Sequence, residues 1–316
     1  MTISNSFDFS VNRNELIELA HQHIGAIGEG ESCTTAQITE GAKLLNMIVK
    51  ARAGDGMPLW SIKTAYILPF TGSNSINATG SHVVSDFDYT TTSAAALSGA
   101  TTLTLTSVAD FGAGYNVGVE QSDGTVLWTT QSGAATGNDI TLATALTEDV
   151  SSGAMVYVYP TASRIPTAPL RILNAYMRNT VAQTDYPINQ ISQDEYFSLG
   201  NKTTPGTPNQ IYYDPDLVGT ASFFLYPRFT GGQQLVYFNY VRPFADFDSA
   251  SDTPDFPQAF YRAIMVELAS MLGPKFGVSM AERKALQQEA TAYFEQALQS
   301  TFQEVSTFME PEGRNW

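Results

Sequence analysis

The side chains that most often ligate metals or act as nucleophiles are few, and they are spread along the chain. Three histidines and one cysteine are present. His21 and His23 stand two positions apart in a segment with helical periodicity, so they point to different faces and cannot chelate one ion together. His82 is isolated, and Cys33 has no neighbouring histidine or basic residue to lower its thiol pKa. These residues indicate neither a metal site nor an activated nucleophile.

An acidic stretch near residue 250 has the spacing with which a calcium-binding loop begins. Asp246, Asp248 and Asp252 could supply its first oxygen ligands. Such a loop also needs glycine at its sixth position and glutamate at its twelfth, where this chain has serine and proline. We therefore interpret the stretch as a solvated acidic connection and predict no metal there.

The remaining catalytic signatures are missing or incomplete. Residues 25–30 are rich in glycine, but they follow a predicted helix and lack the Gly-Lys-Ser/Thr ending of a phosphate-binding loop. No Gly-x-Ser-x-Gly elbow occurs. Paired carboxylates for glycoside cleavage stay open, because their separation depends on the fold. The prediction is a protein that is not an enzyme and has no cofactor.

Composition narrows the class of protein further. The 316 residues are 43% hydrophobic, and 31 acidic against 16 basic residues give a net charge of -15. A sequence-specific DNA-binding protein would show a basic stripe for phosphate contacts, and none is visible. No apolar run reaches the roughly 20 residues of a membrane span, and the polar N-terminus has no secretory signal. With a single cysteine there is no intramolecular disulfide, so we expect folding in a cytoplasm.

Helical periodicity appears at both ends of the chain. The first two helices have an apolar stripe each and should form a hairpin, with Asn12 or Asn14 capping the first and Thr34 or Thr35 the second. A third helix, capped by Asp255, is apolar over most of its circumference and should be the buried partner of that hairpin. A Ser-x-x-Glu capping box opens a fourth helix. The four helices are predicted over residues 14–25, 35 to about 53, the segment from the Asp255 cap to 272, and 279 to about 299.

Between the helices the apolar period shortens to two. Residues 100–160 contain short alternating segments punctuated by Gly, Asn and Asp, the pattern of a compact all-β module rich in threonine. Residues 171–178 fit a strand or a short helix, and a strand is favoured. Residues 73–92 are weakly patterned. Further strands are predicted at 63–68, 210–213, 221–226 and 234–241, and a short helix at 192–199.

These elements predict an α+β fold with a helical-bundle core, made of the N-terminal helix hairpin and two C-terminal helices. A mixed β-region and an inserted small all-β module complete it. The expected segments are residues 1–80 (helical hairpin and first strand), 81–160 (inserted β-module), 161–253 (β-region), 254–300 (C-terminal helices) and 301–316 (an extended C-terminal arm).

Three blocks of sequence give the chain a resemblance to the head-to-tail adaptor family of short-tailed bacteriophages. The first resembles that family's "LLN…G…LW" signature. The resemblance covers about residues 14–77 and 164 to the end, and the module at 81–160 departs from it. The blocks are residues 41–47 with 56–60; residues 186–196, 199–202 and 212–215; and residues 242–243, 246–248 and 254–257 with the following helix and 273–277.

Membership would imply a structural virion protein in the neck or tail, assembled in the host cytoplasm. The resemblance implies a dodecameric homo-oligomeric ring below the portal protein, its helical part docking to the portal and its β part facing the tail nozzle or other tail proteins. The packaged double-stranded DNA would pass through the lumen without specific binding, and no membrane would be involved. The acidic balance adds the hypothesis that a negative lumen repels phosphate during genome ejection.

Two sets of candidate site residues follow. The C-terminal arm has aromatic residues that no periodic element explains, and docking on the portal accounts for them better than disorder does. The acidic loop leads from a strand into the buried helix and is a candidate hinge. The predicted portal-binding residues are Phe302, Phe308, Met309, Arg314 and Trp316, and the predicted hinge residues are Asp246, Asp248, Asp252 and Asp255.

Two other classes of protein stay open. The threonine-rich module is also typical of a tail-fibre or receptor-binding protein, although such proteins trimerise through long β-rich shafts and this chain has helices at both ends. A peptidoglycan hydrolase of the tail is the third class. The symmetry of the assembly separates the first two, and zymography tests the third.

Overall fold

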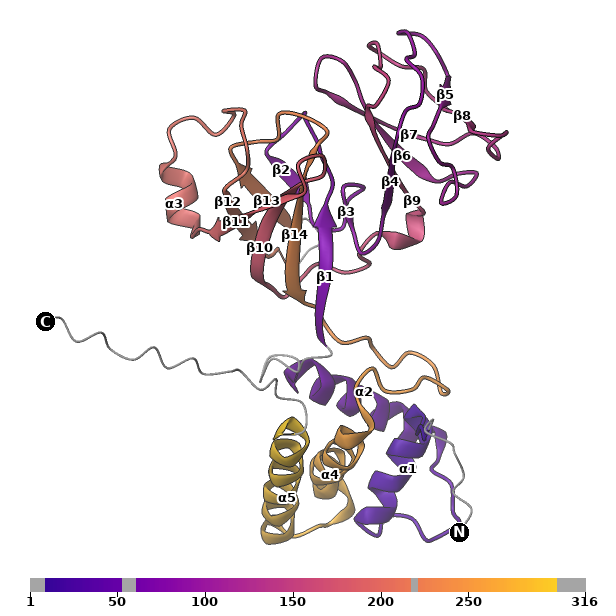
Figure 1. Ribbon diagram of the computed structural model, residues 1–316. Coiled ribbons are helices and arrows are strands. Elements are labelled where there is room, and N and C mark those ends of the chain that lie inside the picture. Colours follow the sequence, from indigo (N-terminus) through magenta and orange to yellow (C-terminus); the bar gives the residue numbers. More distant parts are fainter. Residues whose placement is uncertain (1–8, 53–60, 217–220, 300–316) are drawn as a thin grey trace, which may run out of the picture. The chain divides into compact units, whose positions relative to one another are not determined.

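The computed structural model describes residues 9–52, 61–216 and 221–299. The chain separates into two compact units, one of residues 1–62 and 243–316 and the other of residues 63–242. The first unit contains the four long helices, and the second contains nearly all the β-structure. Figure 1 labels the elements of both.

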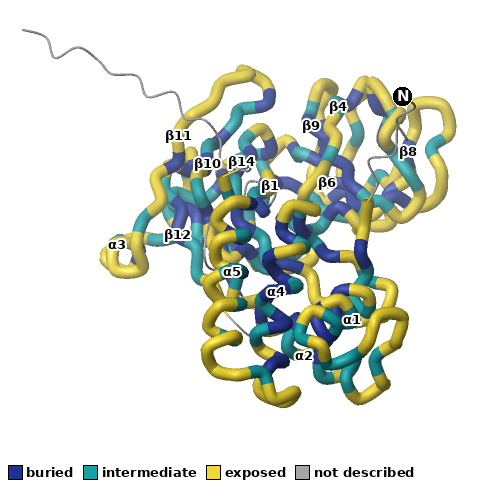
Figure 2. The backbone as a smooth tube through the Cα atoms, turned by 90° about the horizontal axis from the view of Figure 1, so that it is seen from below, coloured by how far each residue is buried: buried dark blue, intermediate teal, exposed yellow. Residues whose placement is uncertain are grey.

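The helical unit is organised around one buried helix. Helix α4 (Tyr261–Leu272) packs against α1 (Arg13–His23), α2 (Thr35–Arg52) and α5 (Met280–Gln299). Its residues Ile264, Leu268 and Leu272 are all at most 3% exposed, as the four-residue apolar spacing predicts. Figure 2 shows α4 mostly buried and α5 mostly exposed along its length. The expected buried partner of the helix hairpin is therefore present.

The helix ends partly follow the predicted signals. The side chain of Asn12 accepts a hydrogen bond from Glu15 N, and Glu15 bonds back to Asn12 N, so Asn12 is the cap of α1. Ser279 and Glu282 form the predicted capping box before α5. The cap predicted at Asp255 is wrong: α4 begins at Tyr261, after a 3-10 turn, with no side-chain cap.

Helix α4 ends at Leu272, as predicted, but not in a left-handed glycine. Its C-cap residue, Gly273, has a right-handed backbone. The chain continues through a 3-10 turn, Gly273–Phe276, and the left-handed residue is Gly277, with φ of 76°. Proline is tolerated in the first turn of a helical segment, so Pro274 is compatible with the 3-10 turn that follows α4.

The β unit contains one eight-stranded sheet. Its strand order is β2-β13-β12-β11-β10-β14-β1-β3, and the β11–β12 pair is parallel while the other pairs with a known register are antiparallel. One face packs into a core that includes Val236 and Phe238. The strands are β1 (Ile62–Ile67), β2 (Ser75–Asn77), β3 (Val83–Val84), β10 (Arg171–Asn179), β11 (Thr184–Gln190), β12 (Gln210–Asp214), β13 (Ser222–Tyr226) and β14 (Gln234–Val241). The strand favoured over residues 171–178 is confirmed, and α3 (Gln193–Ser198) is the predicted short helix.

Residues 88–159 form two smaller sheets with a core of their own. The four-stranded sheet has the order β4-β9-β6-β7, and β5 pairs with β8. The core includes Leu103, Leu105, Val117 and Ile140, each at most 1% exposed. The strands are β4 (Asp88–Thr91), β5 (Thr102–Thr104), β6 (Asn116–Glu120), β7 (Val126–Thr130), β8 (Asp139–Thr141) and β9 (Met155–Tyr159). We call this part of the β unit the insert.

The predicted fold class is wrong. The described chain is mostly β-structure, dominated by the eight-stranded sheet, with the two small sheets beside it, and a helical bundle is not its core. The fold-class prediction gave the helices too much weight, because helical periodicity is a local signal that is strong over long segments. Residues 73–92, which appeared weakly patterned, contain β2, β3 and β4. Strands as short as two to four residues show almost no period.

The insert is attached to the large sheet by aromatic side chains of β7 and β9. The Tyr157 hydroxyl donates to Gly232 O at 2.5 Å, and the Tyr159 hydroxyl donates to Ser81 O. The Trp128 indole N–H donates to Pro69 O at 2.9 Å. Tyr157 and Tyr159 are buried together with Leu68, Val84 and Leu235 of the sheet. Buried side chains with satisfied polar ends hold insert and sheet together.

Candidate functional site

The predicted portal-binding residues cannot be placed. Phe302, Phe308, Met309, Arg314 and Trp316 lie outside the described residues. Their role in docking therefore stays a prediction. The predicted hinge residues, in contrast, all lie in the described part of the helical unit.

The carboxylates of the acidic loop bond to the loop's own backbone. Asp252 Oδ2 accepts hydrogen bonds from the backbone N–H groups of Asp248 at 2.8 Å and Ser249 at 2.6 Å. Asp255 Oδ2 accepts from Ala245 N at 3.1 Å. Short polar side chains that bond nearby N–H groups shape turns, so Asp252 and Asp255 give this connection a defined backbone. Their function as a hinge stays a prediction.

Helix α2 holds the same loop through two side chains one turn apart. Asn46 Oδ1 accepts from Phe247 N at 2.9 Å, and Asn46 Nδ2 donates to Phe247 O at 3.3 Å. Lys50 Nζ donates to Phe244 O at 2.7 Å and lies 2.8 Å from a carboxylate oxygen of Asp246. Lys50 and Asp246 are each about half exposed, so their ion pair adds little stability. The two-point bond of Asn46 is the stronger constraint.

Helix α1 completes the support of the loop. Arg13 N donates to Asp252 O at 2.8 Å, and its guanidinium donates to Asp248 O at 3.2 Å. Phe244 and Phe247 insert into the helical core, where they are 5% and 4% exposed. The loop, predicted to be a solvated connection, is therefore packed on the helical unit through its aromatic residues. Asp246 and Asp248 are exposed, as are the small residues 249–251, whereas Asp252 and Asp255 are partly buried.

The histidines and the cysteine are separate from one another. His21 is fully buried, with Nδ1 2.8 Å from Ile17 O, and His23 is exposed. Burial, with a smaller effect of Glu18, raises the pKa of the Cys33 thiol, the opposite of what a nucleophile needs. Within residues 9–52, 61–216 and 221–299, no three His, Cys, Asp or Glu side chains are grouped so that they could hold a metal.

The second block of the resemblance forms an aromatic cluster at α3. Tyr196 stacks on Tyr212 and contacts Phe224, and its hydroxyl accepts a hydrogen bond from Asn74 Nδ2 at 2.5 Å. Lys202 Nζ donates to Leu199 O at 2.9 Å and lies 5.5 Å from the Tyr196 ring centroid. Periodicity could not reveal this cluster, because its members come from two strands, a helix and two loops.

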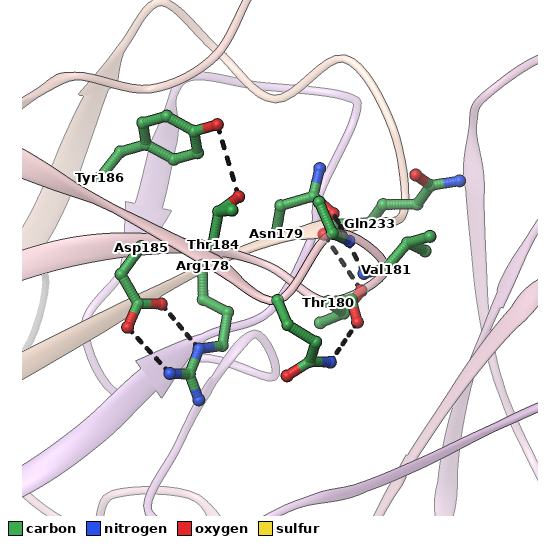
Figure 3. A network of polar contacts seen from close by, with 10 residues as sticks. Arg178, Asn179, Thr180, Val181, Thr184, Asp185, Tyr186 and Gln233 are labelled. Atoms are coloured by element: carbon green, nitrogen blue, oxygen red, sulfur yellow. Dashed lines mark hydrogen bonds and ion pairs between the residues drawn. The ribbon is translucent and has the colours of Figure 1, made fainter.

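The tip of the β10–β11 hairpin contains a network of polar contacts (Figure 3). Arg178 donates two hydrogen bonds, of 2.7 and 2.8 Å, to the carboxylate of Asp185 on the paired strand. Asn179 Oδ1 accepts from the backbone N–H groups of Val181 at 3.0 Å and Ala182 at 2.8 Å. The apolar Val181 side chain at the turn is 60% exposed. A single exposed apolar side chain is common on protein surfaces, so Val181 alone does not mark a contact site.

Comparison of the chain with protein-family models and with curated proteins finds no match. In the described part of the chain, no helix is both long and apolar enough to cross a membrane.

Proposed function

We propose that this chain is a structural connector, a head-to-tail adaptor that forms a ring between the portal and the tail of a short-tailed bacteriophage. The ring, dodecameric by the resemblance, would seal the packaged genome and provide a platform for tail attachment. The order of the three resembling blocks motivates the proposal. The proposed partners are further copies of the chain, the portal and a tail protein, with DNA passing through without specific contacts.

The observation that carries the proposal is the hydrogen-bonded pair of Asn46 and Phe247. Asn46 belongs to the first resembling block and Phe247 to the third, 201 positions later. Blocks that are chance matches have no reason to meet in space, whereas blocks that define one family have a shared structural task. Lys50 and Asp246 extend the same contact by one helical turn.

The second block supports the proposal in the same way. Tyr196, Lys202 and Tyr212 come from its three pieces, and they contact one another through stacked rings and a cation over a ring. All three blocks therefore contribute to packing within their units. A structural task of this kind is what a connector requires, because its function depends on shape and interfaces.

Cryo-electron microscopy of the virion that contains this chain tests the proposal. We expect a closed ring of this chain between portal and tail. A mass measurement of the purified assembly is the simpler companion experiment, with a large ring expected. A trimer located in a peripheral fibre would contradict the adaptor and support the receptor-binding alternative. Clearing of peptidoglycan in zymography would instead support the hydrolase.

A further inference from the structure

A polar pocket of about 330 Å³ lies in the β unit where the insert meets the large sheet. It has an aromatic wall, a guanidinium and a rim of hydroxyl groups. The side chains that matter to its chemistry are Asn116, Trp128, Thr130, Thr144, Tyr159 and Arg164. Its volume is in the range of small-ligand sites, roughly 300–1,000 Å³, and suits one sugar ring. It is remote in sequence from the loop and helices that carry the proposed function.

Arg164 brings an uncompensated positive charge to this pocket. Its guanidinium donates to Asn116 Oδ1 at 3.2 Å, and Asn116 in turn donates to Thr161 Oγ1 at 3.1 Å. Among the described residues, Arg164 forms no ion pair, and its Nε–H is buried without a hydrogen-bond partner. In a chain with 31 acidic and 16 basic residues, a half-buried arginine without a carboxylate is an unusual arrangement.

The nearby imidazole does not share this charge. His82 is stacked on Phe70 and lies edge-on to Trp128. Burial, and then the charge of Arg164, lower the His82 pKa to about 4, so the ring is neutral at pH 7. Arg164 is therefore the group with which an anion entering the pocket would pair, and arginine recognises carboxylates through paired N–H donors.

The rest of the lining suits a hydroxylated ring. Thr129 Oγ1 accepts a hydrogen bond from Thr144 N at 3.1 Å, which leaves its O–H free to donate. Thr130 and Thr144 are exposed at the rim. The polar N–H of Trp128 is already bonded to Pro69 O, so the indole offers the pocket its apolar ring. The negative face of an aromatic ring attracts the weakly positive C–H groups of a sugar.

We propose that this pocket binds an acidic saccharide. The sugar carboxylate pairs with Arg164, the ring C–H groups lie on Trp128, and the hydroxyl groups bond the threonine rim. A neutral sugar lacks the partner for Arg164, and a simple carboxylate lacks the groups for Trp128 and the threonines. The inference does not depend on the adaptor function.

Titration of the full-length protein with four probes tests this. Glucuronate and N-acetylneuraminate are the acidic saccharides, glucose lacks the carboxylate, and acetate lacks the ring. Calorimetry or saturation-transfer NMR should give dissociation constants on the order of 1 mM for an acidic saccharide and at least about tenfold weaker binding for glucose and acetate. Absence of binding by both acidic saccharides overturns the proposal. Acetate binding as tight as that of the sugars overturns the saccharide assignment.

Substitutions then locate the site. Arg164→Gln should weaken binding of the acidic saccharide by about tenfold. Arg178→Gln is the matched control, since Arg178 is paired with Asp185 on β10 and β11, and it should leave binding unchanged. Equal binding by the Arg164→Gln protein overturns the proposal. Thr130→Val and Thr144→Val keep the β-branched shape and are the alternative variants if Arg164→Gln does not fold. Each should weaken sugar binding without changing the acetate signal. Unchanged sugar binding in both variants overturns the proposal.

Discussion

The side-chain amide of Asn46 pairs with both backbone polar groups of Phe247, 201 positions later in the chain. An amide offers one acceptor and two donors, so it satisfies a backbone N–H and C=O at once. Phe247 is 4% exposed, and the loop around it has no regular structure to supply these partners. Asn46 thus replaces the pairing that a strand or helix would provide.

Replacement of Asn46 by alanine should destabilise the helical unit by about 1–3 kcal/mol, because two backbone groups of Phe247 lose their partners. Denaturant unfolding followed by circular dichroism measures the change. Gln288→Ala, an exposed position on α5, is the control and should have an effect within about 0.5 kcal/mol. An Asn46→Ala protein as stable as this control would show that water replaces the lost bonds at no cost.

Gly118 on β6 should not tolerate a side chain. A Cβ there would lie 2.6 Å from Trp128 Cη2, and Trp128 is held by its bond to Pro69 and by contacts with Tyr157 and Tyr159. Gly118→Ala should therefore cost about 1–3 kcal/mol through overpacking. Gly200→Ala is the control, since no atom lies within 4 Å of its Cβ. Thermal unfolding compares the two, and equal melting temperatures would mean that the indole moves aside easily.

His82 should make the β unit less stable in mild acid. Its folded-state pKa is lowered to about 4 from the ordinary 6.5. Between these values the unfolded chain binds a proton that the folded chain does not, so stability falls as pH drops from about 6.5 to about 4. From pH 7 to pH 5 the loss is about 2 kcal/mol.

Denaturant unfolding at both pH values measures this loss. His82→Gln removes the titrating group and should reduce the fall by that amount, whereas His23→Gln, at an exposed position, should behave as the wild type. If the wild-type and His82→Gln proteins show the same pH dependence, folding does not lower the His82 pKa.

Removal of residues 301–316 should leave a folded protein that no longer attaches to portal-filled heads. The reason is the set of aromatic residues in this segment, Phe302, Phe308 and Trp316, which need a partner surface to be buried. Circular dichroism checks the fold, and electron microscopy of heads mixed with the truncated chain checks attachment. Normal attachment would exclude this segment as the portal-binding arm.

Much of the local structure was predictable. The caps at Asn12 and Ser279, the buried spacing of Ile264 and Leu268, and the β10 strand all follow from neighbours within a few positions. Signals of this kind depend on local backbone geometry that repeats every two or 3.6 residues. They can therefore be recognised in the sequence before the fold is known. The fold class was wrong because β2, β3 and β4 are too short to show a period.

The sequence by itself determined where most of the helices and longer strands form, because capping and apolar spacing act over a few residues; the strand β11 and the start of α4 were not predicted. Only the tertiary structure decided that an eight-stranded sheet dominates the chain, that Asn46 meets Phe247, and that Arg164 and Trp128 share a pocket. Each of these depends on pairing between residues that are far apart in the chain. Such pairings are selected by the packing of the whole unit, and no local period records them.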